Sequence, residues 1–175
     1  MDSQAFPLRI RPGTVRDLKV IWELIRGLAV YERRQHDVKA TVERLRRHGF
    51  GRRRYFRTLI CLRGREPVGF ALYFFAYSTF RGRPVLYLED LFVLPRYRRC
   101  GAGKALLAAL ARIAIREGCG RMTWSVLRWN KPAIVFYRRL GATHYDAWTL
   151  MSLGDDALRR LARGTGAPRR GARRA

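Results

Sequence analysis

Acidic residues and lysine are scarce in this chain. It has 13 Asp and Glu residues against 37 Lys and Arg residues, which gives a net charge of +24 at pH 7. Lysine occurs only at positions 19, 39, 104 and 131. A GC-rich genome that replaces lysine on solvated surfaces explains such a bias, and so does selection for an anionic partner such as nucleic acid or a membrane. Basic residues occur in every segment, which favours the first explanation.

Cysteine and long apolar runs are also scarce. Cys61, Cys100 and Cys119 show neither paired spacing nor a C-x-x-C motif, which indicates no disulfide framework and no zinc site. Residues 1–12 lack the apolar region of a signal peptide, and Arg112 interrupts the apolar stretch 105–115. We therefore expect a cytoplasmic protein without a transmembrane segment.

Length and composition indicate one folded domain with a basic extension. The chain has 175 residues, of which 48% are hydrophobic and 12% aromatic, enough for a single core. We expect this domain to span residues 6–163. Residues 164–175 contain only Gly, Ala, Pro, Thr and Arg, which predicts a disordered basic tail. Nonspecific contact with nucleic acid or an anionic surface would involve this tail.

Hydrophobic periodicity predicts a mixed sheet with helices. Alternation and β-branched or aromatic residues predict strands over 6–10, 55–62, 68–77, 85–94, 121–127 and 144–153. Helical spacing and capping residues predict helices over 14–29, 41–48 with Gly49 as its stop, 104–117, a short segment that Gly141 ends, and 155–162. The helix over 104–117 forms a crossover, so the strand after it should run parallel to the strand before it.

The loop over residues 98–103 is the most informative segment. It connects a strand pattern that ends at Leu94 to a helix pattern that begins near Lys104. Backbone N–H groups that converge at a helix N-terminus bind anions. Gly101 and Gly103 permit close approach of a ligand and left-handed backbone conformations. The loop is therefore a candidate pyrophosphate site, and the alternative is a glycine-containing turn between a strand and a helix.

Four motifs carry a resemblance to a known family. They are L-Y-L-E-D-L-F-V at 86–93, Y-R-x-x-G-x-G-K at 97–104, W-N-K-P-A at 129–133 and F-Y-R-R-L-G-A at 136–142. In this order they resemble the GNAT N-acetyltransferases, and among these the diamine (spermidine/spermine) and thialysine N-acetyltransferases. The resemblance implies an α/β fold with three α+β layers, in which helices cover both faces of a mixed central sheet. It also implies acetyl-CoA as acetyl donor, no metal, and a homodimer.

The resemblance assigns cofactor contacts to three segments. The backbone of the strand before the loop would pair with pantetheine like an added strand, and the loop would bind the pyrophosphate. The Asn of the W-N-K-P-A motif would bind the pantetheine amides, although a simple loop cap is the alternative. The expected cofactor residues are Leu91, Phe92, Val93, Arg98, Arg99, Cys100, Gly101, Ala102, Gly103, Lys104, Asn130, Pro132 and Ala133.

Two residues are candidates for proton transfer. By motif position Tyr137 donates a proton to the departing thiolate, and its alternative role is a core tyrosine beside Phe136. Glu89 would accept the proton that the amine loses, through water, whereas the alternative is a solvated carboxylate. Its neighbour Asp90 should face the other side of the strand, since side chains alternate.

The acceptor is expected to be the primary amine of a small molecule: a diamine, a polyamine or a thialysine-like amino acid. By resemblance, the residues that bind it are Tyr31, Glu32, Glu89, Asp90, Asp146 and Trp148. Arg33 and Arg34 directly follow Glu32, and Phe80 stands where the family often has Trp. These departures favour a small amine with its own carboxylate over a polyamine. Acetylation of a protein N-terminus or an aminoglycoside, and nucleic-acid binding by the same fold, are the alternatives.

Overall fold

The computed structural model describes residues 7–145 and 149–164. The chain forms two compact units, one up to residue 127 and one from residue 128 onward. Phe6 of the first expected strand, Asp146, Trp148 and the tail after Gly164 lie outside the described residues.

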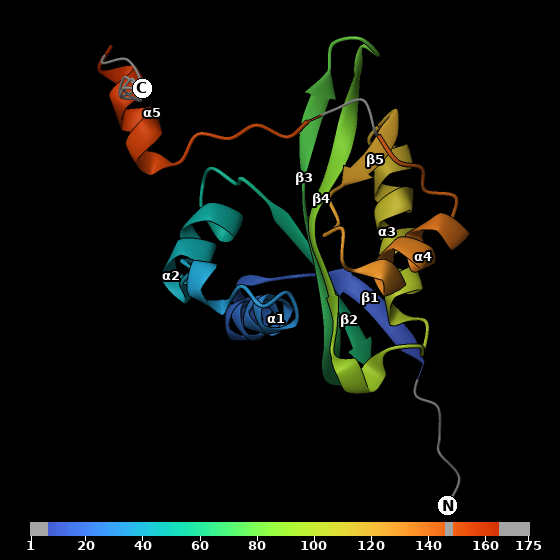
Figure 1. The fold of residues 1–175 in the computed structure, drawn as a ribbon. Helices are drawn as coiled ribbons and strands as arrows, with labels where there is room; N and C mark the ends of the chain where they lie inside the picture. The colour runs from blue at the N-terminus through green and yellow to red at the C-terminus, as the bar shows by residue number, and fades with distance from the viewer. Residues whose placement is uncertain (1–6, 146–148, 165–175) are drawn as a thin grey trace, which may run out of the picture. The chain divides into compact units, whose positions relative to one another are not determined.

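The first unit is built on a five-stranded mixed sheet (Figure 1). Its strands follow the order β1-β2-β3-β4-β5, and the first four pair antiparallel. β5 pairs parallel to β4 after the helical crossover, as predicted. The bounds are β1 Leu8–Pro12, β2 Arg57–Arg63, β3 Glu66–Ser78, β4 Arg83–Val93 and β5 Arg121–Trp124.

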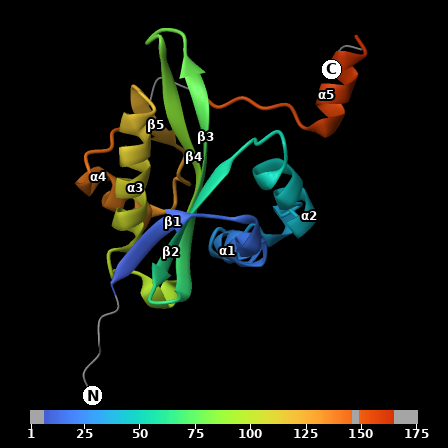
Figure 2. The ribbon, with the colours of Figure 1, turned by 180° about the vertical axis from the view of Figure 1, so that it is seen from behind.

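Helices cover both faces of this sheet, which confirms the expected fold class. Figures 1 and 2 show α1 (Leu18–Tyr31) and α2 (Val42–Leu45) on one side and α3 (Ala102–Arg116) on the other. On the α1 side, a core forms because the apolar stripe of the helix packs on inward side chains of three strands. This core includes Ile21, Leu24, Ile60, Phe70 and Phe92.

The start of α1 follows the predicted capping pattern. A 3₁₀ turn over Val15–Asp17 leads into the helix. The backbone N–H and the hydroxyl of Thr14 donate to Asp17 Oδ2 at 2.7 and 2.9 Å. The Arg11 guanidinium donates to both oxygens of the same carboxylate, at 2.7 Å each. Asp17 therefore joins β1 to the first helix.

Two predicted boundaries in the first unit are wrong. Gly49 does not end the second helix, because the helical path continues as a π-helical turn over Arg46–Phe50. Glycine is needed there for space, since a Cβ would come within 2.5 Å of the Phe56 ring. β5 ends at Trp124 rather than at Leu127.

The second unit contains α4 (Lys131–Arg139) and α5 (Asp155–Ala162). Gly141, at φ +87°, follows the end of α4, as predicted. The prediction of a strand over 144–153 is wrong, because its described parts, 144–145 and 149–153, form no strand. A strand is stable only with a partner and a packed face, and Leu150 and Met151 are 87% and 84% exposed.

Candidate active site

A bulge interrupts β4 at the two adjacent carboxylates. Asp90 pairs with Leu72 and Leu88 pairs with Tyr73, so Glu89 is an extra residue without a partner on β3. A bulge re-aims the side chains next to it. Asp90 lines a pocket on the α1 side, whereas Glu89 is exposed and is not part of its lining.

Beyond this bulge, β4 has a strand on one side only among the described residues. β5 pairs with β4 from Val85 to Leu88 and ends there, while β3 continues to pair up to Val93. The stretch Leu91–Val93 therefore has an edge open to an extended ligand. The Val93 carbonyl already accepts a hydrogen bond from Arg98 Nε at 3.3 Å. This carbonyl is therefore less available to pair with pantetheine than the sequence predicted.

The loop before α3 has the backbone of an anion site. Arg99 and Gly101 are left-handed, at φ 66° and 89°, and Gly101 is the N-cap of α3 without a side-chain capping bond. The first N–H groups of the helix therefore lack a side-chain cap from Gly101, as a backbone anion site requires. Gly103 lies inside α3 and is not left-handed, so the expectation of two left-handed glycines is wrong. Arg99 is the second left-handed residue.

Side chains on both sides hold this loop in place. The Arg98 guanidinium carbon lies 4.3 Å from the centre of the Tyr31 ring. Tyr31 thus contacts the loop and is not part of the pocket lining. The Tyr97 hydroxyl donates to Glu66 on the β2–β3 hairpin. The Cys100 thiol donates to the Tyr97 carbonyl at 2.8 Å, so this cysteine closes the turn.

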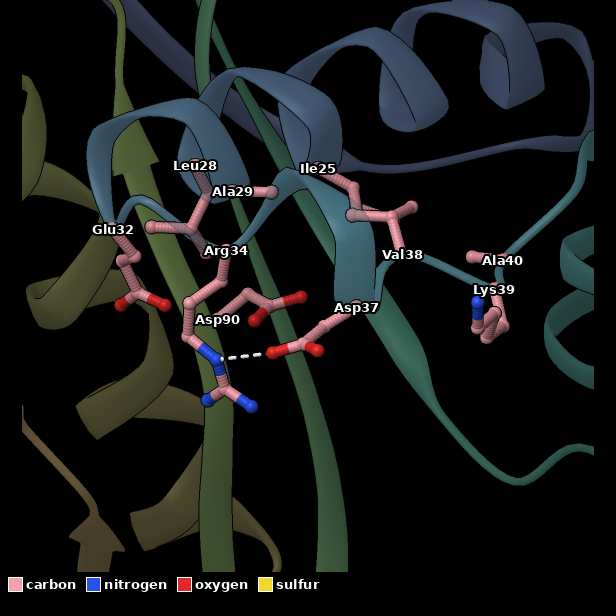
Figure 3. A pocket seen from close by; sticks show the side chains of 10 residues that line it. All are labelled: Ile25, Leu28, Ala29, Glu32, Arg34, Asp37, Val38, Lys39, Ala40 and Asp90. Carbon is pink, nitrogen blue, oxygen red and sulfur yellow. Dashed lines mark hydrogen bonds and ion pairs between the residues drawn. The ribbon is translucent and has the colours of Figure 1, made fainter.

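A pocket of about 260 Å³ lies between α1, residues 34–40 and β4 (Figure 3). Its apolar wall comes from α1 and the following loop. Its charged lining consists of Glu32, Arg34, Asp37, Lys39 and Asp90. Ionisable side chains of both signs in one small concave site are typical of a site for a charged ligand.

The acidic residues of the pocket titrate differently. Burial, together with the charges of Glu89 and Glu32, raises the pKa of Asp90 to about 7. Burial also raises the pKa of Glu32, against the opposing effect of Arg34. The hydrogen bond from Arg34 lowers the pKa of Asp37. A pKa of about 7 lets Asp90 exchange a proton near neutral pH.

A left-handed arginine brings the basic residues to this pocket. At the end of α1 the N–H of Arg33 donates to the Val30 carbonyl and that of Arg34 to the Ala29 carbonyl, at 3.1 and 2.8 Å. Arg33 has φ 60°, the conformation of a Schellman motif in which glycine is usual. The chain then turns back, and Arg34 Nε donates to Asp37 Oδ2 at 2.7 Å.

Sequence reasoning missed Arg34, Asp37 and Lys39 as site residues. The charges that follow Glu32 directly were the available signal, but their approach to Asp90 depends on the turn at Arg33. The other end of the loop is fixed by α1 and α2. Trp22 Nε1 donates to the Ala40 carbonyl at 3.2 Å, and Arg44 Nη1 donates to the Lys39 carbonyl at 2.9 Å.

The second unit carries the expected Asn and Tyr. Asn130 is buried at 7% exposure and caps α4, because its Oδ1 accepts the Ala133 N–H at 3.3 Å. Pro132 lies in the first turn of the helix, where it is well tolerated. Tyr137 is partly buried, and its ring centre lies 5.3 Å from that of Phe136.

Residues 7–145 and 149–164 contain no group of three or more His, Cys, Asp or Glu side chains placed to hold a metal ion. Among the same residues, no helix has the length and apolar character needed to cross a membrane.

Comparison with known proteins identifies the family. Residues 19–142 match the acetyltransferase (GNAT) family. A thialysine N-epsilon-acetyltransferase of Mus musculus is 38% identical over 165 residues, which cover 88% of this chain and 96% of that protein. An L-ornithine N5-acetyltransferase of Arabidopsis thaliana is 43% identical over 93 residues, 53% of this chain and 41% of that protein.

A solved structure shares the fold. An integron cassette protein from the mobile metagenome of V. cholerae superposes with a TM-score of 0.74 at 24% identity, covering 89% of this chain and 97% of that chain. The family match and the thialysine N-epsilon-acetyltransferase relative define the protein as an acetyltransferase enzyme. The chain belongs to the acetyltransferase (GNAT) family.

Proposed function

We propose that the enzyme transfers an acetyl group from acetyl-CoA to the primary amine of a small molecule that binds in the pocket of Glu32 and Asp90. The observation that carries this proposal is the pocket itself, in which two carboxylates with raised pKa values lie beside apolar residues of α1. Such carboxylates attract an ammonium group. The names of the thialysine and ornithine relatives support an amine of this size.

The residues present fit acetyl-CoA. The left-handed Gly101 and the uncapped first turn of α3 suit a pyrophosphate. The open edge of β4 at Leu91–Val93 suits the pantetheine arm, and Asn130 is proposed to orient its amides. The remaining contacts are assigned to Arg98, Arg99 and the start of α3. When bound, acetyl-CoA supplies an activated acyl thioester.

Proton transfer is assigned to Asp90 as well as Glu89. An amine attacks only when neutral, and its ordinary pKa keeps it protonated at neutral pH. Asp90, with its pKa of about 7, accepts this proton at the pocket wall. Glu89, on the adjacent bulge, passes it on to water. The neutral nitrogen then attacks the acyl carbon directly, and Tyr137 donates a proton to the sulfur that departs.

We also propose that residues 6–163 act as one domain in a cytoplasmic homodimer. The unpaired spacing of the three cysteines supports a reducing location. Leu150, Met151 and Leu153 are exposed in the second unit, and an apolar segment of this kind supports self-association. Nonspecific contact of the tail with nucleic acid or an anionic surface is proposed from its arginines alone.

An amine screen tests the function. Purified protein is incubated with acetyl-CoA and a panel of diamines, polyamines, diamino acids, aminoglycosides and peptides with free N-termini, and released CoA thiol is measured. We expect turnover with the small primary amines. Turnover confined to peptides or aminoglycosides, or no turnover together with tight salt-dependent retention on nucleic acid, would overturn the proposal.

A further inference from the structure

The charges that line the pocket are divided between two places. Glu32 and Asp90 come from the end of α1 and from the β4 bulge, whereas Asp37, Arg34 and Lys39 come from residues 34–39 of the returning loop (Figure 3). The proposed function uses only the first pair. The second group has both an anion and two cations, which a site for simple diamines does not need.

Arg34 is held in place by one bond and keeps other donors available. Its Nε donates to Asp37 Oδ2 at 2.7 Å, and Figure 3 shows the terminal nitrogens extending beyond that bond. A guanidinium has five N–H donors in a fixed fork that suits a carboxylate. The Arg34 side chain is 58% exposed, so a ligand reaches these donors from solvent. Because Asp37 already orders the Arg34 side chain, ligand binding loses less side-chain conformational entropy.

Lys39 adds a second cation on the same loop. Its backbone carbonyl is fixed by Arg44, and the neighbouring Ala40 carbonyl is fixed by Trp22. The backbone at this end of the pocket is therefore held from α1 and α2. Lys39 also lies close enough to Asp37 to contribute to the lowered pKa of that carboxyl.

The charge balance of the lining favours a zwitterionic acceptor. Three carboxylates face two cations in the pocket, which leaves one negative charge in excess when all are ionised. A diamino acid carries two ammonium groups and one carboxylate, and therefore one positive charge in excess. Diamines and polyamines carry two or more positive charges and no group for Arg34 to bind, so they meet repulsion from Arg34 and Lys39.

We propose that Arg34, supported by Lys39, is the residue that selects acceptors carrying a carboxylate. Asp37 binds the α-ammonium group of the same acceptor, while its side-chain amine reaches Glu32 and Asp90. This inference rests on the proposed function, since it assigns the far end of the same pocket. The α-amino acid with a terminal side-chain amine already belongs to the proposed acceptors, and the new assignment is the residue that recognises its carboxylate.

Matched pairs of acceptors test this assignment. Ornithine is compared with 1,4-diaminobutane and thialysine with its decarboxylated diamine, so each pair differs only in the carboxylate. We expect wild-type kcat/KM to be higher for the amino acid by roughly 10- to 100-fold, the value of a charge-assisted hydrogen bond. Equal values within each pair would overturn the inference and leave the proposed function intact. If the enzyme acetylates neither member of either pair, the proposed function itself is overturned.

Variants at two arginines, one inside and one outside the pocket lining, separate recognition from net charge. Arg34→Gln should raise KM for the amino acids by roughly tenfold or more and increase kcat/KM for the diamines, so that the preference falls or inverts. Arg34→Lys should restore part of the preference because it keeps the charge. Arg16→Gln removes the same charge at an exposed position outside the pocket lining, and should leave the preference unchanged. Equal effects of Arg34→Gln on both members of a pair would show that Arg34 only shapes the pocket.

Discussion

The guanidinium of Arg98 lies over the ring of Tyr31, with 4.3 Å between the guanidinium carbon and the ring centre. A cation over an aromatic face at this distance is attractive. The contact joins the last residue of α1 to the first residue after the 3₁₀ turn Pro95–Tyr97. Arg98 is also bonded to the Val93 carbonyl. Tyr31 therefore connects the proposed cofactor loop to the helix that forms the acceptor pocket.

Removal of the Tyr31 ring should weaken acetyl-CoA binding. We expect Tyr31→Ala to raise KM for acetyl-CoA by roughly three- to thirtyfold, because a partly exposed cation–π contact contributes about 0.5–2 kcal/mol. Steady-state kinetics with acetyl-CoA as the varied substrate measures this effect. Tyr31→Phe keeps the ring and should retain nearly normal KM. If Tyr31→Phe raises KM for the amine more than KM for acetyl-CoA, the Tyr31 hydroxyl instead contacts the acceptor directly.

The proposed cofactor loop depends on the left-handed backbone of Gly101. At φ 89° a Cβ is strained, although a Cβ would meet only Leu8 Cδ1, at 3.9 Å. Gly101→Ala should lower stability by about 1–2 kcal/mol and reduce acetyl-CoA affinity by tenfold or more, as measured by calorimetry. Gly118, at φ 68° with open space around it, is the matched control. Gly118→Ala should show similar destabilisation with unchanged affinity, and equal affinity in both variants would remove the loop from the cofactor site.

The Arg11–Asp17 pair should make the fold sensitive to acid. Bonds from Arg11 and Thr14 lower the pKa of Asp17 from 3.8 to about 2. The unfolded chain therefore takes up a proton at higher pH than the folded chain, so this stabilisation is present above pH 4 and is lost as pH falls to 2. Asp17→Asn should cost on the order of 2 kcal/mol at pH 7. Denaturant melts at pH 7 and pH 3 measure it, and an equal difference at both would contradict the linkage.

Local pattern predicted more of the fold than of the pocket. The capping role of Asp17 and the turn at Gly141 were predictable because each depends on residues close in sequence. The parallel β5 was predictable because a helical crossover connects it to β4. The bulge at Glu89 was not, since period-two alternation assumes an uninterrupted ladder. The place of Arg34 depends on a left-handed arginine at position 33, where propensity favours glycine.

The strand expected over 144–153 shows the limit of periodicity. Its residues alternate, but alternation only describes a segment suited to pair. Pairing needs an available edge, and Leu150 and Met151 remain exposed where the structure describes them. The acceptor residues expected from this region, Asp146 and Trp148, lie outside the described residues and stay predictions.

Tyr137 is predicted to act on the chemical step. Tyr137→Phe should lower kcat by roughly 10²- to 10⁴-fold with acetyl-CoA affinity retained, because only the proton donor is removed. Steady-state kinetics and calorimetry on the same preparation separate the two effects. Tyr77 on β3 is 66% exposed, and Tyr77→Phe removes a phenol from the surface as a control. Normal kcat in Tyr137→Phe would leave this tyrosine as a packing partner of Phe136.

Asp90 has opposite effects on stability and activity as pH rises. Because its pKa is raised from 3.8 to about 7, the folded chain keeps a proton that the unfolded chain releases. Stability is therefore lost as pH rises from about 4 to 7. Asp90→Asn has no charge to desolvate, so it should be more stable than the wild type at pH 8, by up to roughly 4 kcal/mol. Denaturant melts at pH 5 and pH 8 measure this gain.

Activity should follow the ionised form of the same carboxyl. Wild-type kcat/KM for the amine should rise with pH through about 7, since Asp90 accepts a proton only when ionised. Asp90→Asn should lose this limb and fall by roughly 10²-fold or more at pH 7.5. Glu89→Gln on the adjacent residue should lower the rate but keep the limb, moved to lower pH because the charge of Glu89 helps to raise the pKa of Asp90. A pH limb retained in Asp90→Asn and abolished in Glu89→Gln would transfer the role of base to Glu89, although only Asp90 of the two lines the acceptor pocket.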